Sequence, residues 1–205
     1  MKIICLDLEG VLIPEIWIAF SQATGIPELS RTTRDEPDYD KLMRYRLDLL
    51  TKYNLKLADI QKVISGMDPL PGALDFANAV REKTQLIMLS DTFEQFAKPL
   101  MQKLGWPSLF CNSLEIAADG AVSGYKLRQK DGKRMAVLAF KSMNMTIFAA
   151  GDSYNDLAMI KEADRGCLFR APESIRKDHS EIPCVDTFYE LNAQIDEFLT
   201  QEYIP

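Results

Sequence analysis

The first twelve residues constrain the fold more than any other stretch of the chain. A short apolar run, Ile3 to Leu6, leads into the carboxylates Asp7 and Glu9 and stops at Gly10. The run is too short for a helix and predicts a buried strand of a parallel sheet. In open α/β sheets, ligands bind outside the carboxyl ends of the strands. We therefore expect both acids to face a crevice, where their mutual repulsion implies a hard cation such as Mg²⁺.

Composition limits the partners of the chain. Its 205 residues fit one domain, or a core domain with a smaller insert, and its net charge of −6 comes without a Lys/Arg-rich block. We therefore expect no nucleic-acid partner and no membrane association. Asp7 interrupts the first apolar run too early for a signal peptide, and no later run could span a bilayer. Four widely spaced cysteines predict small buried side chains rather than a disulfide or zinc set. A cytoplasmic enzyme fits these features.

The order of predicted elements divides the chain in two. Residues 14–69 predict helices only, at 14–24, 39–53 and 57–65, and we interpret them as a helical cap inserted after the first strand. From Pro71 onwards, strands alternate with helices, which indicates βαβ units and a parallel sheet. The sequence thus predicts an α/β fold, a Rossmann-like doubly wound parallel sheet formed by residues 1–13 and 70–205, with a small cap.

Three predicted strands end in polar residues. Asp7 and Glu9 follow the first, Ser90 and Asp91 follow strand 85–89, and the run from Asp152 to Asp156 follows strand 146–150. Parallel strands bring these ends together. The Ser90 hydroxyl and the N–H groups of helix starts suit phosphate oxygens, and the acids suit a metal that neutralises them.

The order of these motifs resembles the haloacid dehalogenase superfamily. The four motifs are an Asp-x-acid-x-Val run, a Ser after the second core strand, a helix-borne Lys, and Gly-Asp-x-x-Asn-Asp. Their spacing and the helical insert are similar to the phosphoserine phosphatase branch. The resemblance covers essentially the whole chain and implies an enzyme with this core fold and with Mg²⁺ as cofactor.

The resemblance also implies roles for individual residues. Asp7 matches a nucleophile that forms an aspartyl-phosphate, and Glu9 stands where the family has an Asp as general acid and base, with its backbone carbonyl on the metal. The motif lysine is Lys133, which we favour at the start of a helix, or else Lys130 or Lys126. Ser90 matches a phosphate-binding hydroxyl, and Asp91 adjoins it as a substrate contact. Asp152 matches a metal ligand. Asn155 and Asp156 match supporting groups.

The predicted cap offers information on the substrate. On helix 39–53, Arg46 falls on the apolar stripe formed by Tyr39, Leu42, Met43, Leu50 and Tyr53. An inward arginine needs an anion, and its planar fork suits a carboxylate. Glu15 could hold an ammonium group, so the two residues together would recognise an α-amino acid that carries a phosphate. They also fall where phosphoserine phosphatases bind the carboxylate and amine of their substrate. In the alternative, Arg46 reaches solvent or pairs with Asp40.

Glu9 departs from the usual family pattern. Its extra methylene places the carboxyl group about one bond length further from Asp7, where it can protonate a leaving oxygen but is less suited to activating water. The same substitution resembles a bifunctional branch that also transfers the phosphoryl group to homoserine. The sequence thus predicts an enzyme of amino-acid biosynthesis that acts on phosphoserine. The alternatives are a phosphatase of another small phosphate ester and a non-catalytic phosphoryl-accepting switch.

Overall fold

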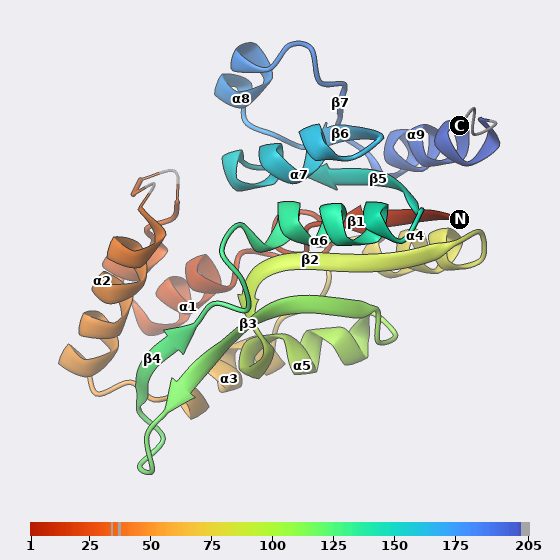
Figure 1. Ribbon diagram of the computed structural model, residues 1–205. Coiled ribbons are helices and arrows are strands. Elements are labelled where there is room, and N and C mark those ends of the chain that lie inside the picture. The colour runs from red at the N-terminus through yellow and green to blue at the C-terminus, as the bar shows by residue number, and fades with distance from the viewer. Residues whose placement is uncertain (34, 37, 202–205) are drawn as a thin grey trace.

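The computed structural model describes residues 1–33, 35–36 and 38–201; parts of the predicted cap and of the C-terminal end of the predicted core lie outside them. Within the described part, a seven-stranded sheet has the order β4-β3-β2-β1-β5-β6-β7 (Figure 1). Only the β3–β4 pair is antiparallel. The strands are β1 (Lys2–Leu6), β2 (Gln85–Phe93), β3 (Ser108–Ile116), β4 (Val122–Lys126), β5 (Thr146–Gly151), β6 (Arg165–Phe169) and β7 (Cys184–Val185).

Helices cover both faces of the sheet, so the predicted doubly wound architecture is confirmed. Side chains of β1 alternate between two apolar layers, with Ile4 and Leu6 in one and Ile3 and Cys5 in the other. The first layer is completed by α4 (Ala73–Arg81), α5 (Glu94–Lys103) and α9 (Phe188–Thr200), and the second by α6 (Gly132–Ser142), α7 (Leu157–Glu162) and α8 (Glu173–Asp178). Burial on both faces explains why the first strand is continuously apolar.

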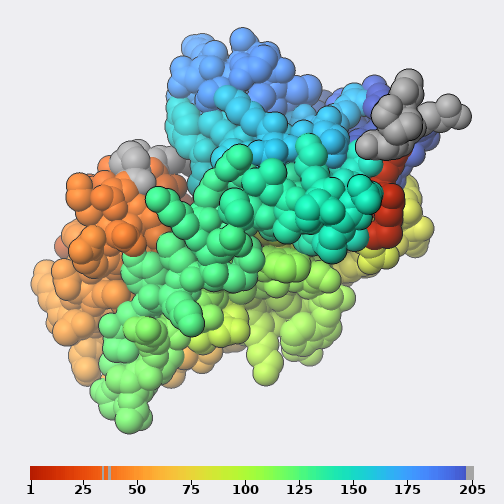
Figure 2. All heavy atoms as spheres, in the orientation of Figure 1, coloured from red at the N-terminus to blue at the C-terminus, as the bar shows by residue number. Residues whose placement is uncertain are grey.

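In the segment between β1 and α4, the described residues form helices joined by loops and contain no strand. It contains α1 (Ile16–Thr24), the 3₁₀ turn η1 (Pro27–Ser30), α2 (Tyr39–Lys52) and α3 (Leu57–Ser65). Gly25, at φ 68°, ends α1 in the left-handed conformation, and Asp38 caps α2 by accepting from the Lys41 N–H. These residues form a lobe beside the sheet (Figure 2). The division into a core and a cap domain at residues 14 and 69 stays a prediction.

The β3–β4 hairpin connects this lobe to the sheet. Lys56 Nζ donates to the carbonyl of Asp119 at 2.8 Å, and the Leu57 N–H donates to the carbonyl of Gly120 at 3.1 Å. The Tyr125 hydroxyl donates to the Asp40 carboxylate. The hairpin therefore contacts the helical lobe at the start of α2 and at the start of α3.

Three local predictions were wrong. The strand expected at 85–89 extends to Phe93, with a shift of register between Leu89 and Phe93 that takes Ser90 and Asp91 out of the ladder. Residues 108–111 and 114–117, expected as separate strands, form the single strand β3. All four cysteines are free, but only Cys5 and Cys167 are buried, while Cys111 and Cys184 are partly exposed.

Among the described residues, no helix is long and apolar enough to cross a membrane.

Candidate active site

Asp7 directly follows β1 and is only 5% exposed. Its N–H donates to the carbonyl of Ala150 on β5 at 3.0 Å, and its Oδ1 accepts from the Leu8 N–H at 2.7 Å. Gly10 then turns the chain at φ 77°, and a Cβ at that position would lie 2.7 Å from the Asp152 carboxylate. Only glycine allows both the turn and this close approach. The turn thus brings the ends of β1 and β5 together.

Lys133 links the carboxylates at these strand ends. It lies in the first turn of α6, and its Nζ is 3.0 Å from Asp7 Oδ1 and 2.7 Å from Asp156 Oδ1. Burial alone would lower the pKa of Lys133, but Asp156 and Asp7 hold it well above its usual value. Lys126 and Lys130 are exposed. Of the three lysines that the sequence left open, the structure therefore brings Lys133 into the site.

Asp156 is completely buried and organises the turn after β5. Its Oδ2 accepts from the N–H groups of Asp152 and Ser153, both at 3.0 Å, and from the Ser153 hydroxyl at 3.2 Å. A Cβ at Gly151 would lie 2.2 Å from the Asp156 carboxyl carbon, so this position also requires glycine. Both oxygens of Asp156 are thus used within the chain, as expected for a supporting group.

Carboxylate oxygens of Asp7, Asp152 and Asp156 lie within 4.8 Å of one another. Burial raises the pKa of Asp7 well above its usual value; Asp156 and Asp152 raise it further, and Lys133 lowers it. A hard cation would relieve this repulsion, and oxygen ligands of this kind are those that Mg²⁺ prefers. The residues present therefore fit Mg²⁺. The Glu9 side chain, expected beside Asp7 and Asp152, is not in this group of carboxylates.

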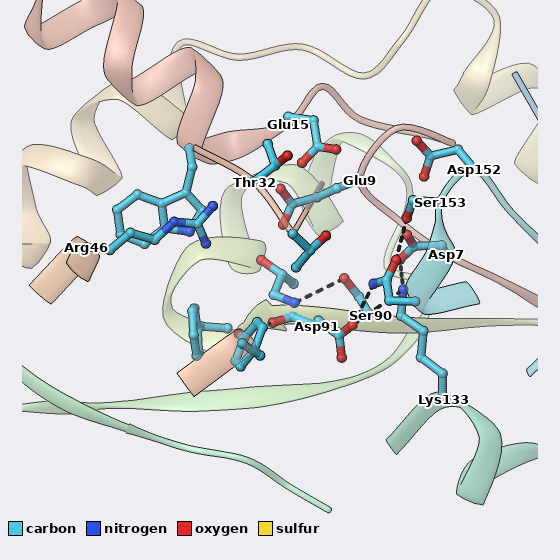
Figure 3. Close-up of a pocket in the computed structure, with 16 residues that line it drawn as sticks. Asp7, Glu9, Glu15, Thr32, Arg46, Ser90, Asp91, Lys133, Asp152 and Ser153 are labelled. Carbon is cyan, nitrogen blue, oxygen red and sulfur yellow. Dashed lines mark hydrogen bonds and ion pairs between the residues drawn. The ribbon is translucent and has the colours of Figure 1, made fainter. Parts of the chain in front are cut away.

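Glu9 instead turns towards the cap (Figure 3). Its Oε2 accepts from the N–H of Ile16, the first residue of α1, at 2.9 Å. Burial raises the pKa of Glu9, while this hydrogen bond, the nearby Thr92 hydroxyl and Arg46 lower it. The Glu9 carboxyl group, which the sequence predicts beside Asp7, is thus held by the backbone at the start of α1.

Ser90 and Asp91 form the floor of the pocket in Figure 3. The Ser90 hydroxyl is buried and accepts from the Thr92 N–H at 3.2 Å. Asp91 Oδ2 accepts from Asn155 Nδ2 at 2.7 Å and lies 3.8 Å from Lys133 Nζ. The second and fourth predicted motifs therefore meet at this point.

Arg46 lies at the opposite end of the pocket, on α2 (Figure 3). It is 6% exposed, its guanidinium stacks 4.5 Å from the Trp17 ring, and its Nη2 donates to the carbonyl of Arg31 at 2.8 Å. Burial lowers the pKa of Arg46 to about 10, opposed by Tyr39, Glu9 and Glu15. Its Nε is buried and has no hydrogen-bond partner among the residues that the structure describes.

These contacts decide between the expectations for α2. Arg46 neither reaches solvent nor pairs with Asp40, which accepts from Tyr125. Tyr53 is 40% exposed, so its assignment to the inward stripe was wrong. Glu15 lines the same pocket as Arg46.

Several lining residues were missed from the sequence. They come from the first cap helix, the loop before α2, the start of α2 and the end of β2: Trp17, Thr32, Thr33, Tyr39, Thr92 and Phe93. The threonines lie in a polar loop with no periodicity, so the sequence carries no signal for them. The apolar rings predict packing, and a role at a pocket follows only from their position beside Arg46 or Asp91.

The sheet order, the acidic strand ends and the buried lysine together define an α/β protein with a Rossmann-like sheet, whose site combines a carboxylate cluster with a neighbouring helical lobe. Residues 1–164 match the haloacid dehalogenase-like hydrolase family, and the chain belongs to this family. It is therefore an enzyme.

Two relatives are identical to this chain at more than half of the aligned residues. It is 53% identical over 194 residues to phosphoserine phosphatase ThrH of Pseudomonas aeruginosa, covering 95% of both chains. It is 52% identical over 204 residues to a phosphoserine phosphatase of Pseudomonas syringae pv. tomato, covering 100% of this chain and 86% of the relative. A solved phosphoserine phosphatase, described as a phospho-aspartyl intermediate analogue, superposes with a TM-score of 0.78 at 19% identity, covering 94% of this chain and 97% of the other. This last likeness shows the fold alone.

Proposed function

We propose that the chain hydrolyses O-phospho-L-serine to L-serine and phosphate through an aspartyl-phosphate on Asp7, with Mg²⁺ as cofactor. One observation carries the proposal: a single pocket has a buried aspartate at one end and, at the other, a buried arginine N–H for which no described residue supplies an acceptor. A buried donor without an acceptor is costly, and a ligand carboxylate would satisfy it. The names of the two close relatives support the same substrate.

In the proposed first step, a carboxylate oxygen of Asp7 attacks phosphorus and the bond from phosphorus to the seryl oxygen breaks. Glu9 gives its proton to that oxygen, so serine leaves with a neutral hydroxyl group rather than as an alkoxide. Lys133 and the Ser90 hydroxyl hold the phosphoryl oxygens, with Asn155 and Asp91 beside them. Asp7, Asp152 and the Glu9 carbonyl would hold Mg²⁺, which when bound neutralises negative charge at the phosphoryl group.

In the proposed second step, a hydroxyl attacks the phosphorus of the aspartyl-phosphate, Glu9 takes the proton of that hydroxyl, and the Asp7 carboxylate is released. The attacking group is water in hydrolysis. In transfer, it is the hydroxyl of L-homoserine, and the product is O-phosphohomoserine. Homoserine has the same α-carboxylate and α-amine as serine, so it would use the vacated contacts with Arg46 and Glu15 and gain the advantage of proximity over free water.

The position of Glu9 supports this second activity. Its carboxyl group is fixed by the Ile16 N–H on the cap side of the pocket, where an amino-acid hydroxyl would arrive, rather than among the carboxylates around Asp7. We place such an enzyme in the cytoplasm and in the biosynthesis of serine and threonine.

The substrate proposal is tested by measuring phosphate release from phosphoserine, phosphothreonine and simple phosphate esters with Mg²⁺. We expect phosphoserine to have the highest kcat/KM. A preference for an ester without the α-carboxylate would remove Arg46 from substrate recognition and identify another small phosphate ester as the substrate. A single phosphorylation of the protein without turnover would identify a switch.

The transfer proposal is tested by phosphorus NMR at fixed phosphoserine with increasing L-homoserine. We expect O-phosphohomoserine to appear at the expense of inorganic phosphate, and Glu9→Asp to shift the product ratio back towards hydrolysis. If no phosphohomoserine appears at saturating homoserine, transfer fails and the phosphatase activity alone remains.

A further inference from the structure

Asn112 is a buried polar residue on β3 that does not line the pocket. Its Nδ2 donates to the carbonyl of Asp91 at 3.1 Å, and its Oδ1 accepts from the N–H of Arg128 at 3.0 Å. One short amide side chain therefore joins two backbone segments that are distant in the sequence. Each segment leads to a residue that the proposed function assigns to the phosphoryl group.

The hydrogen bond from Asn112 to the Asp91 carbonyl replaces part of the backbone hydrogen bonding between β2 and β3. The register between β2 and β3 shifts between Leu89 and Phe93, and the regular pairing resumes at Phe93 with Asn112. A bulge of this kind leaves backbone groups unpaired. The Asn112 amide satisfies the Asp91 carbonyl within the bulge, and so fixes the peptide that follows Ser90.

The bond to Arg128 fixes the approach to Lys133. Arg128 lies just after the end of β4, and the chain from there reaches α6 at Gly132, whose carbonyl accepts from Arg128 Nη2 at 3.1 Å. Lys133 is the next residue, and its Nζ must meet Asp7 and Asp156. A displacement of about 1 Å at a phosphoryl-binding group is enough to slow a reaction substantially.

The cap reaches the same carbonyl. The hydroxyl of Tyr39, the first residue of α2, donates to the Asp91 carbonyl at 3.1 Å. Arg46 lies further along α2. The Asp91 carbonyl therefore receives one donor from the sheet and one from the helix that carries the proposed carboxylate-binding group.

We propose that Asn112 is a positioning residue: it sets the Ser90–Asp91 peptide and the segment that leads to Lys133 in register with each other, so that both contact one phosphoryl group. The proposal rests on the proposed function for the roles of Ser90 and Lys133. It requires a side chain with both a donor and an acceptor, which an amide has and a carboxylate or an alkyl group lacks.

The main test is Asn112→Asp, which has the same shape and keeps the acceptor for the Arg128 N–H but loses the donor to the Asp91 carbonyl. The probe is inorganic phosphate, measured with Mg²⁺ as a competitive inhibitor and by calorimetry. We expect Asn112→Asp to weaken phosphate binding about tenfold, because the Asp91 carbonyl loses one of its two donors and a carboxylate oxygen takes the place of that donor. We expect kcat/KM to fall by the same factor on phosphoserine and on p-nitrophenyl phosphate, because the phosphoryl contacts are common to both.

Gln95→Leu is the matched control. The Gln95 amide also makes two backbone hydrogen bonds to β3, donating to the Leu114 carbonyl at 3.1 Å and accepting from the Leu114 N–H at 2.9 Å. It contacts neither phosphoryl-binding segment. We expect Gln95→Leu to lower Tm to a similar extent as Asn112→Ala, a variant that removes both hydrogen bonds of Asn112. We expect the phosphate affinity of Gln95→Leu to stay within about twofold of the wild-type value, because the substitution lies away from the phosphoryl-binding segments. If Gln95→Leu weakens phosphate binding as much as the Asn112 variants do, Asn112 has only a structural role.

Tyr39→Phe tests the shared carbonyl. Each single variant leaves the Asp91 carbonyl one donor, whereas Tyr39→Phe with Asn112→Ala leaves it none. We expect the loss of phosphate affinity in the double variant to exceed the product of the two single losses. Purely multiplicative losses would mean that the two residues do not act through this carbonyl.

These measurements separate the two proposals. If the wild-type chain releases phosphate from phosphoserine but Asn112→Asp and Asn112→Ala bind phosphate as the wild type does, the positioning role is wrong and the proposed function stands. If the wild type does not act on phosphoserine but the Asn112 variants still weaken phosphate binding, the substrate is wrong and the positioning role stands.

Discussion

The two ends of the pocket differ in how their charges are satisfied. At the core end, Lys133 contacts Asp7 and Asp156, and every oxygen of Asp156 has a partner within the chain. At the cap end, Arg46 stacks on Trp17 and keeps one buried N–H without an acceptor in the described part of the chain. The carboxylates and the lysine of the core end are thus paired with each other, whereas under the proposed function the cap end is completed by the ligand.

The difference follows from the elements that build each end. The core end comes from strand ends of one sheet, which fixes its side chains relative to each other, and under the proposed function it serves any phosphoryl group. The cap end comes from α1 and α2, which lie outside the sheet, and under the proposed function it selects what carries the phosphoryl group. Changes at the core end should therefore affect all substrates equally, and changes at the cap end should discriminate between them.

Removal of divalent metal should have the largest effect. We expect complete loss of activity in excess chelator on both phosphoserine and p-nitrophenyl phosphate, because the carboxylates of Asp7 and Asp152 would face each other and the phosphoryl group without a cation. Added Mg²⁺ should restore both activities in parallel. Full activity in excess chelator would contradict the metal assignment.

Asp7→Asn should be nearly as severe. An amide is a very poor nucleophile, so we expect kcat to fall by roughly 10³-fold or more on both substrates, with the fold retained by circular dichroism. Mass spectrometry must exclude deamidation back to aspartate. Residual activity that remains high on either ester would remove Asp7 from its role as nucleophile.

Arg46→Ala should separate the two ends. Loss of a charge-assisted contact costs about 1.5–3 kcal/mol, so kcat/KM on phosphoserine should fall roughly ten- to a hundredfold. The value for p-nitrophenyl phosphate, which has no carboxylate, should change little. Equal losses on both esters would indicate damage to the cap rather than loss of carboxylate recognition.

Trp17→Leu should give the smallest effect, and like Arg46→Ala it should lower kcat/KM on phosphoserine. The ring holds the guanidinium by stacking, an interaction of about 0.5–2 kcal/mol, so we expect a loss of roughly two- to thirtyfold in kcat/KM on phosphoserine, as an increase in KM. The substrate without a carboxylate again serves as control. A decrease in kcat with KM unchanged would mean that Trp17 acts on the chemical step and not through Arg46.

Much of the core end could be predicted from the sequence, since short-range signals coincide there. The apolar run before Asp7 specifies a buried strand, and the run before Asp152 specifies a second. Its place at the start of a helix favoured Lys133 over Lys126 and Lys130, but the pattern left all three open, because burial of the lysine depends on the geometry of the loop that precedes α6. Asn112, which accepts from the Arg128 N–H in that loop, has a sequence context that shows only a strand.

The cap end was less predictable. Helical periodicity placed Arg46 on the inward face of α2, and its burial agrees with that placement. Periodicity could not show that Glu9 turns to the N–H of Ile16, because that contact depends on how the chain enters α1. It also wrongly included Tyr53, which lies in the C-terminal turn where α2 leaves the packed surface.

The hydrogen bond from Ile16 to Glu9 has a consequence for protein engineering. Among the described residues, the proposed proton carrier Glu9 is anchored to the backbone through the first amide of α1, so the direction of its carboxyl group depends on the path of residues 14–17. Libraries of variants at residues 14–17 could change the direction of the Glu9 carboxyl group while leaving Asp7, Lys133 and Asp152 as they are. The partition between water and alcohol acceptors would then become adjustable by backbone geometry alone.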